Sequence, residues 1–208
     1  MPLLLELFKG TGSAGKAFKG KVISVDNEKK YNPTILTDIL KLNYKDLPTP
    51  DYIWASPPCS SYTNMALTRA KVSRDGRNQR NTDTMKPLTP SAVLGDKLLK
   101  KTIEIIRYFS KLNPKLRWVM ENPHGSMWKS PHMKKLPKYH TEKTLYCLYG
   151  DKRRKPTDFF SNVKLNLKEG NCGSKVDMAY LSLCDRYKIP KPLMTQIFKQ
   201  LPTAQRVS

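Results

Sequence analysis

The sequence predicts an α/β domain with a mostly parallel sheet and a C-terminal antiparallel hairpin. Two observations lead to this fold class. Short apolar runs such as 3–8 and 52–55 end in glycines or prolines and are followed by polar side chains, as buried parallel strands are. Further along the chain, residues 91–112 carry apolar side chains at helical spacing, which is typical of a crossover helix. The 208 residues fill one core and are too few for two comfortable domains, so we expect 1–208 to be a single domain.

The charge balance indicates a polyanionic partner. There are 38 Lys and Arg residues against 17 Asp and Glu, a formal net charge of +21. Such an excess favours nucleic acid before a membrane surface. No apolar run approaches the roughly 18–20 residues of a membrane span, and the first residues lack the features of a signal peptide. We expect an intracellular protein, in the cytoplasm or nucleus of the (host) cell, and not a secreted one.

The cysteine and histidine patterns predict neither a disulfide framework nor a metal site. The four cysteines contain no CxxC pair and no regular spacing, which also fits a reducing compartment. The three histidines, His124, His132 and His140, are eight residues apart, which is not ligand spacing on one element. We interpret them as surface or phosphate-contacting residues.

The first apolar run, 3–8, leads into Gly10-Thr-Gly12-Ser-Ala-Gly15 and a short helical segment. Glycines at this position let the backbone approach a ligand closely, and the helix N-terminus offers free N–H groups. Nicotinamide dinucleotides and S-adenosylmethionine are both candidate ligands, and this motif alone does not choose between them.

Acidic residues follow the next two predicted strands. Asp26 and Asn27 come after Val22–Val25, where a carboxylate can accept hydrogen bonds from ribose hydroxyls or cap a helix. Asp38 comes after the short strand 34–37 and could meet an adenine amino group.

The strand Tyr52–Ala55 ends abruptly at Ser56-Pro57-Pro58, and Cys59 is the first side chain after this turn. Prolines donate no hydrogen bond, so the chain must leave the sheet there. A thiol at the carboxyl end of a central strand lies where open α/β sheets bind ligands. The alternative is a small apolar residue packed under a loop.

A basic loop spans 64–90, with six Lys or Arg and two Asp. It is either a solvated loop or a phosphate-contacting one, and its place beside Cys59 favours the second. Its candidate nucleic-acid contacts are Arg69, Lys71, Arg74, Arg77 and Arg80.

The strand 116–120 ends in Glu121-Asn122-Pro123 and should lie beside the Cys59 strand, since consecutive strands are usually neighbours. A second basic region, 129–155, contains a predicted hairpin of 145–149 and 157–161. The run Lys152 to Lys155 lies in the turn of this hairpin, and we interpret it as a binding surface rather than a nuclear-import signal. The segment 163–208 contains two packing helices, one over 176–187 with Ser174 as N-cap and one starting at Pro190.

Taken in order, these motifs resemble the C5-cytosine DNA methyltransferases. Glu6-Leu-Phe8-Lys-Gly10-Thr-Gly12 is similar to the cofactor loop of that family, Pro58-Cys59 to its Pro-Cys nucleophile motif, and Glu121-Asn122 to its Glu-Asn motif. Arg153-Arg154-Lys155-Pro156-Thr157 stands in the place of its substrate-binding arginines. The variant looks most like the short enzymes of some phages and large DNA viruses.

The resemblance implies a Rossmann-like, S-adenosylmethionine-dependent methyltransferase fold and transfer of a methyl group to carbon 5 of a flipped-out cytosine in DNA. Cys59 would be the nucleophile, assisted by Glu121 and Asn122, with Arg153 or Arg154 on the base. The cofactor would contact Phe8, Gly10, Gly12, Asp26, Asn27, Asp38 and Pro57. Besides the arginines and lysine of the 64–90 loop, the nucleic acid would contact Ser60, Ser61, Lys152 and Lys155.

Two departures from the family stand out. Only about 26 residues, 162–189, occupy the place of its target-recognition domain, and its Gln-x-Arg-x-Arg pattern is absent. Sequence recognition would then be short, loose, or supplied by the basic loop at 64–90. We expect a monomer or weak dimer.

Other functions stay open. Ser56-Pro57-Pro58 also fits the first three positions of amino-methyltransferases acting on cytosine N4 or adenine N6, although Cys59 cannot stack on a base as their aromatic residue does. RNA is an alternative substrate. A nicotinamide oxidoreductase would leave Cys59 and Glu121 without a role, and a non-catalytic nucleic-acid-binding protein would leave them unused.

Overall fold

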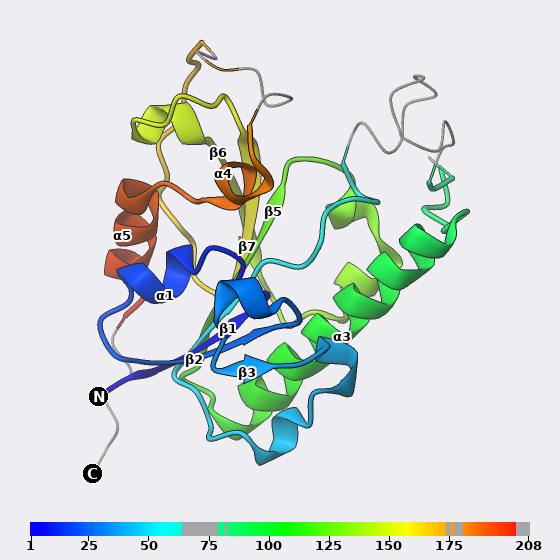
Figure 1. Cartoon of the computed structure of the whole chain (residues 1–208), viewed down its shortest axis with the longest axis vertical. Helices are drawn as coiled ribbons and strands as arrows, with labels where there is room; N and C mark the ends of the chain where they lie inside the picture. The colour runs from blue at the N-terminus through cyan, green and yellow to red at the C-terminus, as the bar shows by residue number, and fades with distance from the viewer. Residues whose placement is uncertain (64–78, 82, 174–175, 177–180, 203–208) are drawn as a thin grey trace.

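The computed structural model describes residues 1–63, 79–81, 83–173, 176 and 181–202. Within them the chain forms a seven-stranded sheet of order β3-β2-β1-β4-β5-β7-β6 (Figure 1). The first five strands of this order are parallel, β7 is antiparallel to β5, and β6 is antiparallel to β7. The predicted fold class is confirmed. The strands are β1 (Leu3–Leu7), β2 (Lys21–Asp26), β3 (Ile35–Leu36), β4 (Tyr52–Ala55), β5 (Arg117–Pro123), β6 (His140–Leu145) and β7 (Pro156–Ser161).

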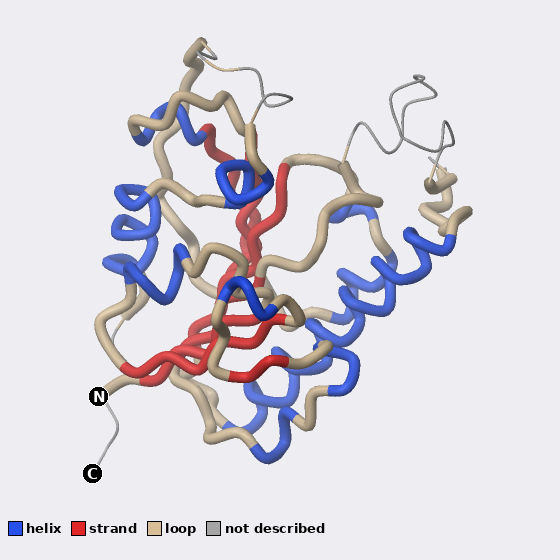
Figure 2. The backbone as a smooth tube through the Cα atoms, in the orientation of Figure 1, coloured by secondary structure: helices blue, strands red, loops and turns tan. Residues whose placement is uncertain are grey.

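The strands separate two apolar layers because successive side chains point to opposite faces of a sheet. In β4, Ile53 and Ala55 join one core cluster, whereas Tyr52 and Trp54 join the other. Helices cover both faces (Figure 2). The parallel strands are therefore buried on both sides, which explains their nearly continuous apolar sequences.

Helix α3 (Pro90–Leu112) covers the first face and confirms the crossover helix expected at 91–112. Its start is fixed by Thr89, whose hydroxyl accepts a hydrogen bond from the Ala92 N–H at 3.2 Å, and by proline at the first helical position. Leu99, Ile103 and Ile106 are buried at helical spacing against the sheet.

Helices α1 (Ser13–Ala17) and α5 (Lys191–Gln200) cover the second face. The ring of Phe18 packs between those of Tyr52 and Phe198, at centroid distances of 5.2 and 5.3 Å. The helix predicted from Pro190 is confirmed. Helix α4 (Leu183–Tyr187) is shorter than the predicted 176–187, and Ser182 is its N-cap. The expected cap Ser174 lies outside the described residues.

The C-terminal hairpin has different bounds from those predicted. Its first strand is His140–Leu145, whereas Tyr146–Tyr149 forms the 3₁₀ helix η6. Cys147 in this turn forms a disulfide with Cys172, which corrects the expectation that the cysteines stay unpaired. The two cysteines are 25 residues apart, and only the fold of the segment after β7 brings them together.

Five further 3₁₀ helices connect the described elements. They are η1 (Lys29–Tyr31), η2 (Ile39–Lys41), η3 (Tyr44–Asp46), η4 (Met127–Lys129) and η5 (Pro131–Lys135). Among the residues described, no helix is both long enough and apolar enough to cross a bilayer.

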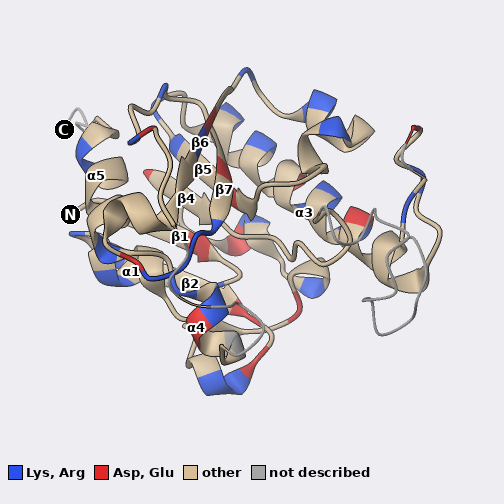
Figure 3. Cartoon of the chain, turned by 90° about the horizontal axis from the view of Figure 1, so that it is seen from above, with Lys and Arg blue, Asp and Glu red and all other residues tan. Residues whose placement is uncertain are grey.

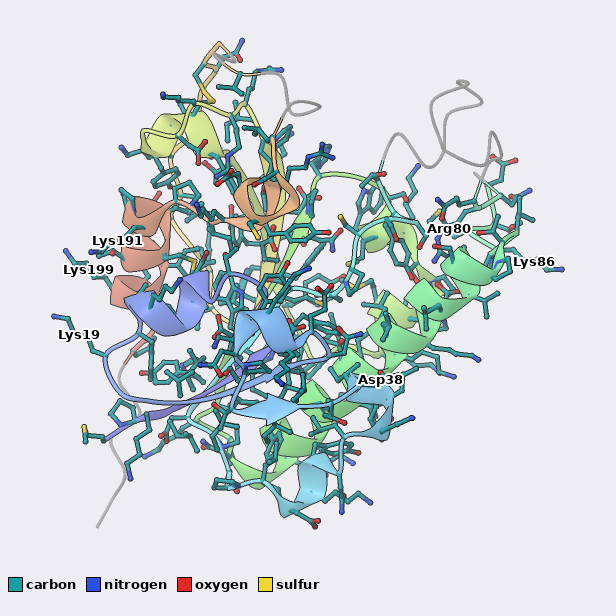
Figure 4. The ribbon with its side chains drawn as sticks, viewed as in Figure 1. Lys19, Asp38, Arg80, Lys86, Lys191 and Lys199 are labelled. Carbon is teal, nitrogen blue, oxygen red and sulfur yellow. A yellow bond between two sulfur atoms is a disulfide. The ribbon has the colours of Figure 1, made fainter. Side chains whose placement is uncertain are left out.

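The basic loop holds one arginine with an unexpected role. Arg69, Lys71, Arg74 and Arg77 lie outside the described residues. Arg80 is only 1% exposed, and its guanidinium donates to the Ser61 and Ala92 carbonyls and pairs with Asp96 at 2.8 Å (Figure 4). It also lies over the Tyr62 ring, 3.9 Å from the centroid. The structure therefore gives Arg80 a structural role in place of the expected phosphate contact.

Replacing Arg80 should destabilise the fold strongly. Arg80→Met removes the cation that pairs with Asp96 and the donor to the Ser61, Met85 and Ala92 carbonyls, so we expect the free energy of unfolding to fall by about 3–5 kcal/mol. Urea denaturation measures it. The control Lys86→Met, on an exposed side chain nearby, should change stability by less than about 0.5 kcal/mol. Equal effects would contradict the role assigned to Arg80.

Candidate active site

The sequence-predicted motifs meet at the carboxyl edge of the sheet. In the parallel pair β4–β5, Ala55 lies opposite Met120, so Ser56, which follows β4, and Glu121, which is still in β5, lie side by side. β1 is the other neighbour of β4, with Leu7 opposite Ala55, and leads into the glycine turn. The topology thus brings the glycine turn, the Cys59 turn and the Glu-Asn motif together.

Asn122 joins the Cys59 turn to the Glu-Asn motif. Its side-chain amide donates to the Pro57 carbonyl at 2.9 Å, and the residue is 1% exposed. Proline at 57 has no N–H, but its carbonyl remains a full acceptor. Asn122 is therefore a positioning residue for the turn, and Pro57 contributes its backbone oxygen.

A second contact holds the far end of the same turn. The Tyr62 carbonyl accepts from both the N–H of Ser126, at 2.7 Å, and its hydroxyl, at 3.0 Å. Gly125 lies so close that a Cβ there would be 2.2 Å from this oxygen. Within the turn, the Cys59 carbonyl accepts from the N–H groups of Tyr62 and Thr63. Residues 57–63 are thus held at both ends.

The Cys59 thiol is partly exposed and lies in the electrostatic field of two charged groups. Desolvation raises the pKa of the thiol, the positive charge of Lys155 lowers it, and the negative charge of Glu121 raises it. Burial dominates, so the net direction is upward. Lys155, which is predicted as a nucleic-acid contact, provides the positive charge that favours the thiolate.

Glu121 is 6% exposed and has a partner that the sequence did not indicate. The Tyr146 hydroxyl donates to Glu121 Oε1 at 3.3 Å. Tyr146 is fully buried, and its pKa is raised well above the usual value by burial and then by the Glu121 charge, so the phenol keeps its proton. The cationic groups of Arg153 and Lys155 lie 5.4 and 5.1 Å from its ring centroid.

The two candidate substrate arginines are placed differently. Arg153 is 6% exposed, and its guanidinium binds Asp151 and the Asp185 and Lys188 carbonyls. Arg153 thus connects the segment before β7 to α4, and its N–H donors are directed at these groups of the protein and not at a substrate. Arg154 is exposed and donates to Asn171 Oδ1 at 3.0 Å.

The remaining predicted contacts surround the thiol or lie at the surface. Ser60 and Lys152 are exposed, whereas Ser61 is buried and accepts from Arg80 at 2.9 Å, so Ser61 supports the turn instead of facing a nucleic acid. His124 pairs with Asp158 at 2.8 Å. Among the described residues, no group of three or more His, Cys, Asp or Glu could hold a metal ion.

The glycine turn fits a nucleoside ligand. Phe8, Gly10 and Gly12 have positive φ values of 59°, 48° and 68°, a conformation suited to glycine and rare for phenylalanine. A Cβ at Gly10 would meet no atom closer than 4.0 Å, so the space beside it is open to a ligand. Glu6 Oε1 accepts a hydrogen bond from the Gly15 N–H at 3.1 Å. Glu6 Oε2 is buried and has no hydrogen-bond partner among the described residues.

The acidic candidates have the chemistry that ribose and adenine require. Asp26 accepts from the Gly10 and Glu28 N–H groups at 2.8 and 2.9 Å, and Asp38 accepts from the Leu40 N–H at 2.9 Å. Each carboxylate has about four lone-pair positions, so both retain acceptor capacity for hydroxyl or amino donors. Asn27 is exposed at the same edge. The residues present therefore fit S-adenosylmethionine.

Two solved structures of methyltransferases share the fold of this chain. The S. pombe Dnmt2 methyltransferase aligns with 100% of this chain at a TM-score of 0.53 and 15% identity. The Entamoeba histolytica methyltransferase EhMeth aligns with 82% at a TM-score of 0.50 and 12% identity. The chain spans 57% of the length of each. At the sequence level, neither a protein-family profile nor a curated protein matches it.

Thiol alkylation as a function of pH should report the charges around Cys59. In a Cys184→Ser background, which removes the exposed free cysteine, Lys155→Met should move the midpoint of iodoacetamide reactivity to higher pH, because it removes a charge that lowers the pKa. Glu121→Gln should move it to lower pH. The control Lys152→Met removes an exposed cation three residues further from β7 and should leave the midpoint in place. Identical shifts in both lysine variants would contradict the assignment.

Proposed function

We propose that the protein transfers a methyl group from S-adenosylmethionine to carbon 5 of a flipped-out cytosine in DNA. The observation that carries the proposal is the Asn122–Pro57 hydrogen bond, which holds the Cys59 turn against β5, the strand that contains Glu121. A nucleophilic thiol and a buried carboxyl thereby face the same edge as a glycine turn that fits the cofactor.

The chemistry requires both groups. Carbon 5 of cytosine is a poor nucleophile, and addition of the Cys59 thiolate to carbon 6 moves the electron pair of the C5–C6 double bond onto carbon 5. Glu121 shares a proton with ring N3 and so neutralises the charge that the addition creates. S-adenosylmethionine, when bound, supplies an electrophilic methyl group. Once carbon 5 is methylated, its proton is lost to water. The electron pair released reforms the C5–C6 double bond and expels the Cys59 thiolate, which restores the aromatic ring.

The surroundings of the two groups support these roles. Lys155 favours the thiolate form against the desolvation of Cys59. The Tyr146 hydroxyl holds one Glu121 oxygen, which orients the carboxyl without contacting substrate. Tyr146 is therefore a positioning residue. The exposed Arg154 and Ser60 are the remaining candidates for contact with the flipped nucleotide.

Nucleic acid as substrate is supported by the net charge of +21 (Figure 3). Carbon 6 of a cytosine is inaccessible in a duplex, so the base must leave the stack, at a cost of a few kcal/mol. Amino-methylation is the principal rival because Ser56-Pro57-Pro58 fits it, but Cys59 replaces the aromatic residue that would stack on the base. RNA cytosine is the second rival substrate.

A mechanism-based trap should separate these reactions. With S-adenosylmethionine and DNA containing 5-fluorocytosine, whose carbon 5 has no proton to lose, the wild-type protein should form a covalent adduct that is stable on a denaturing gel. Cys59→Ala should form none and should lose methyl transfer by at least about 10³-fold. The readouts are the gel and mass spectrometry of the modified nucleoside in DNA and RNA arms.

Cys184→Ser is the matched control and should retain full activity, since Cys184 is an exposed residue of α4 and is not among the groups that shift the pKa of Cys59. An N4-methylcytosine or N6-methyladenine product, or full activity of Cys59→Ala, would overturn the proposal. Formation of 5-methylcytosine in RNA alone would replace the substrate and keep the mechanism.

Removing the Tyr146 hydroxyl should slow the reaction without weakening DNA binding. We expect Tyr146→Phe to lower kcat by about 10-fold, the value of a lost hydrogen bond to a charged group, with KM for DNA unchanged. The control Tyr149→Phe removes another hydroxyl of the same 3₁₀ helix, one that accepts a hydrogen bond from the Lys168 N–H. In this variant kcat should stay unchanged. Parallel losses of kcat in both variants would indicate a general structural effect.

A further inference from the structure

The outer face of α3 carries a stripe of exposed cations that no step of the proposed reaction uses. Lys100, Arg107 and Lys111 are spaced by seven and four residues, which places them on one side of the helix. Lys45 from η3 and Lys135 from η5 flank this stripe, and the five cations line a groove of about 440 Å³. We call it the α3 groove.

The positive charge of the α3 groove is not compensated within the protein. Glu104 is the one acidic side chain among its described lining residues. The Tyr44 hydroxyl donates to Glu104 at 2.6 Å, and Lys101, outside the groove, lies at 3.6 Å. None of the five groove cations has an acidic partner within 4 Å in the described part of the chain. A ligand that supplies several negative charges would therefore find unpaired cations.

The floor of the groove is rigid. Tyr44 is 5% exposed, and its ring packs edge-on against those of Tyr108 and Phe109, at 5.2 and 6.3 Å. The Tyr44 hydroxyl is fixed by Glu104, which together with burial raises the pKa of Tyr44 to about 12. The concave shape thus comes from core side chains, and only the cations at its rim are free to adapt.

The α3 groove connects to the candidate active site through one contact chain. His132, on its wall, lies 3.8 Å from Asp96, and Asp96 accepts from the Tyr62 hydroxyl at 2.5 Å. The Tyr62 N–H in turn donates to the Cys59 carbonyl.

From Lys100 to Lys111 the helix rises about 16 Å, which equals roughly five base-pair steps of a DNA duplex.

We propose that the α3 groove binds the phosphate backbone of double-stranded DNA that flanks the target cytosine. The inference rests on the proposed substrate and extends it. A linear set of cations leading away from the Cys59 turn matches the charge and length of a DNA backbone segment, and phosphate contacts of this kind position a protein on DNA without reading its sequence.

Affinity measurements at several salt concentrations test this assignment. Fluorescence anisotropy with a 24-base-pair duplex would compare the wild type with Lys100→Gln/Arg107→Gln, which removes two groove cations. We expect Kd to rise at least about 10-fold and the slope of log Kd against log salt to fall by about 2. At saturating DNA, kcat should be unchanged, since neither residue touches the Cys59 site.

The matched control is Lys191→Gln/Lys199→Gln on α5. These exposed lysines line another cavity, on the side of the molecule opposite α3 (Figure 4). Their replacement lowers the net charge by two, as the replacement of Lys100 and Arg107 does. The control should alter Kd less than threefold. Equal weakening by both double variants, or a groove effect confined to an RNA duplex, would overturn the inference.

The same samples separate this inference from the proposed function. Groove-dependent duplex binding without any 5-methylcytosine would refute the reaction and leave the surface assignment standing. Formation of 5-methylcytosine with a Kd that is unaffected by the groove substitutions would refute the surface assignment alone.

Discussion

The candidate site depends on one buried hydrogen bond, from the Asn122 amide to the Pro57 carbonyl. Its contribution to stability is only about 1 kcal/mol, but its geometric effect is larger. β4 and β5 are parallel, so their carboxyl ends would diverge into independent loops without a link between them. With the link, the thiol after one strand and the carboxyl at the end of the other are held in one register, and small displacements of such groups cost large factors in rate.

Much of this arrangement follows from local sequence. Tyr52–Ala55 is apolar on both faces and is stopped by two prolines, so both the strand and the position of Cys59 were predictable. The same holds for α3, where buried residues recur at helical spacing, and for the glycine turn, where Gly10 and Gly12 adopt the positive φ values that favour glycine. In each case the residues that determine the element lie within it.

The features that escaped prediction are those set by distant partners. In the sequence, Arg80 is one more cation of a polar loop. It is buried because the Ser61 and Ala92 carbonyls accept hydrogen bonds from its guanidinium. Tyr146 lies in an apolar run that suggests a strand, and its bond to Glu121 spans 25 residues. The Cys147–Cys172 disulfide likewise joins segments with no shared pattern. Burial in the tertiary fold overrode local propensity at each of these positions.

The reversed direction of β7 has a consequence for how the thiol is tuned. Because Thr157 lies opposite Pro123, the incoming end of β7 adjoins the outgoing end of β5, and Lys155 enters the site from upstream of its strand. Cys59 follows β4 and Glu121 lies near the outgoing end of β5, whereas Lys155 precedes β7. Lengthening or shortening the 146–155 connection would thus change the acidity of the Cys59 thiol, while Cys59 and Glu121 themselves stayed in place.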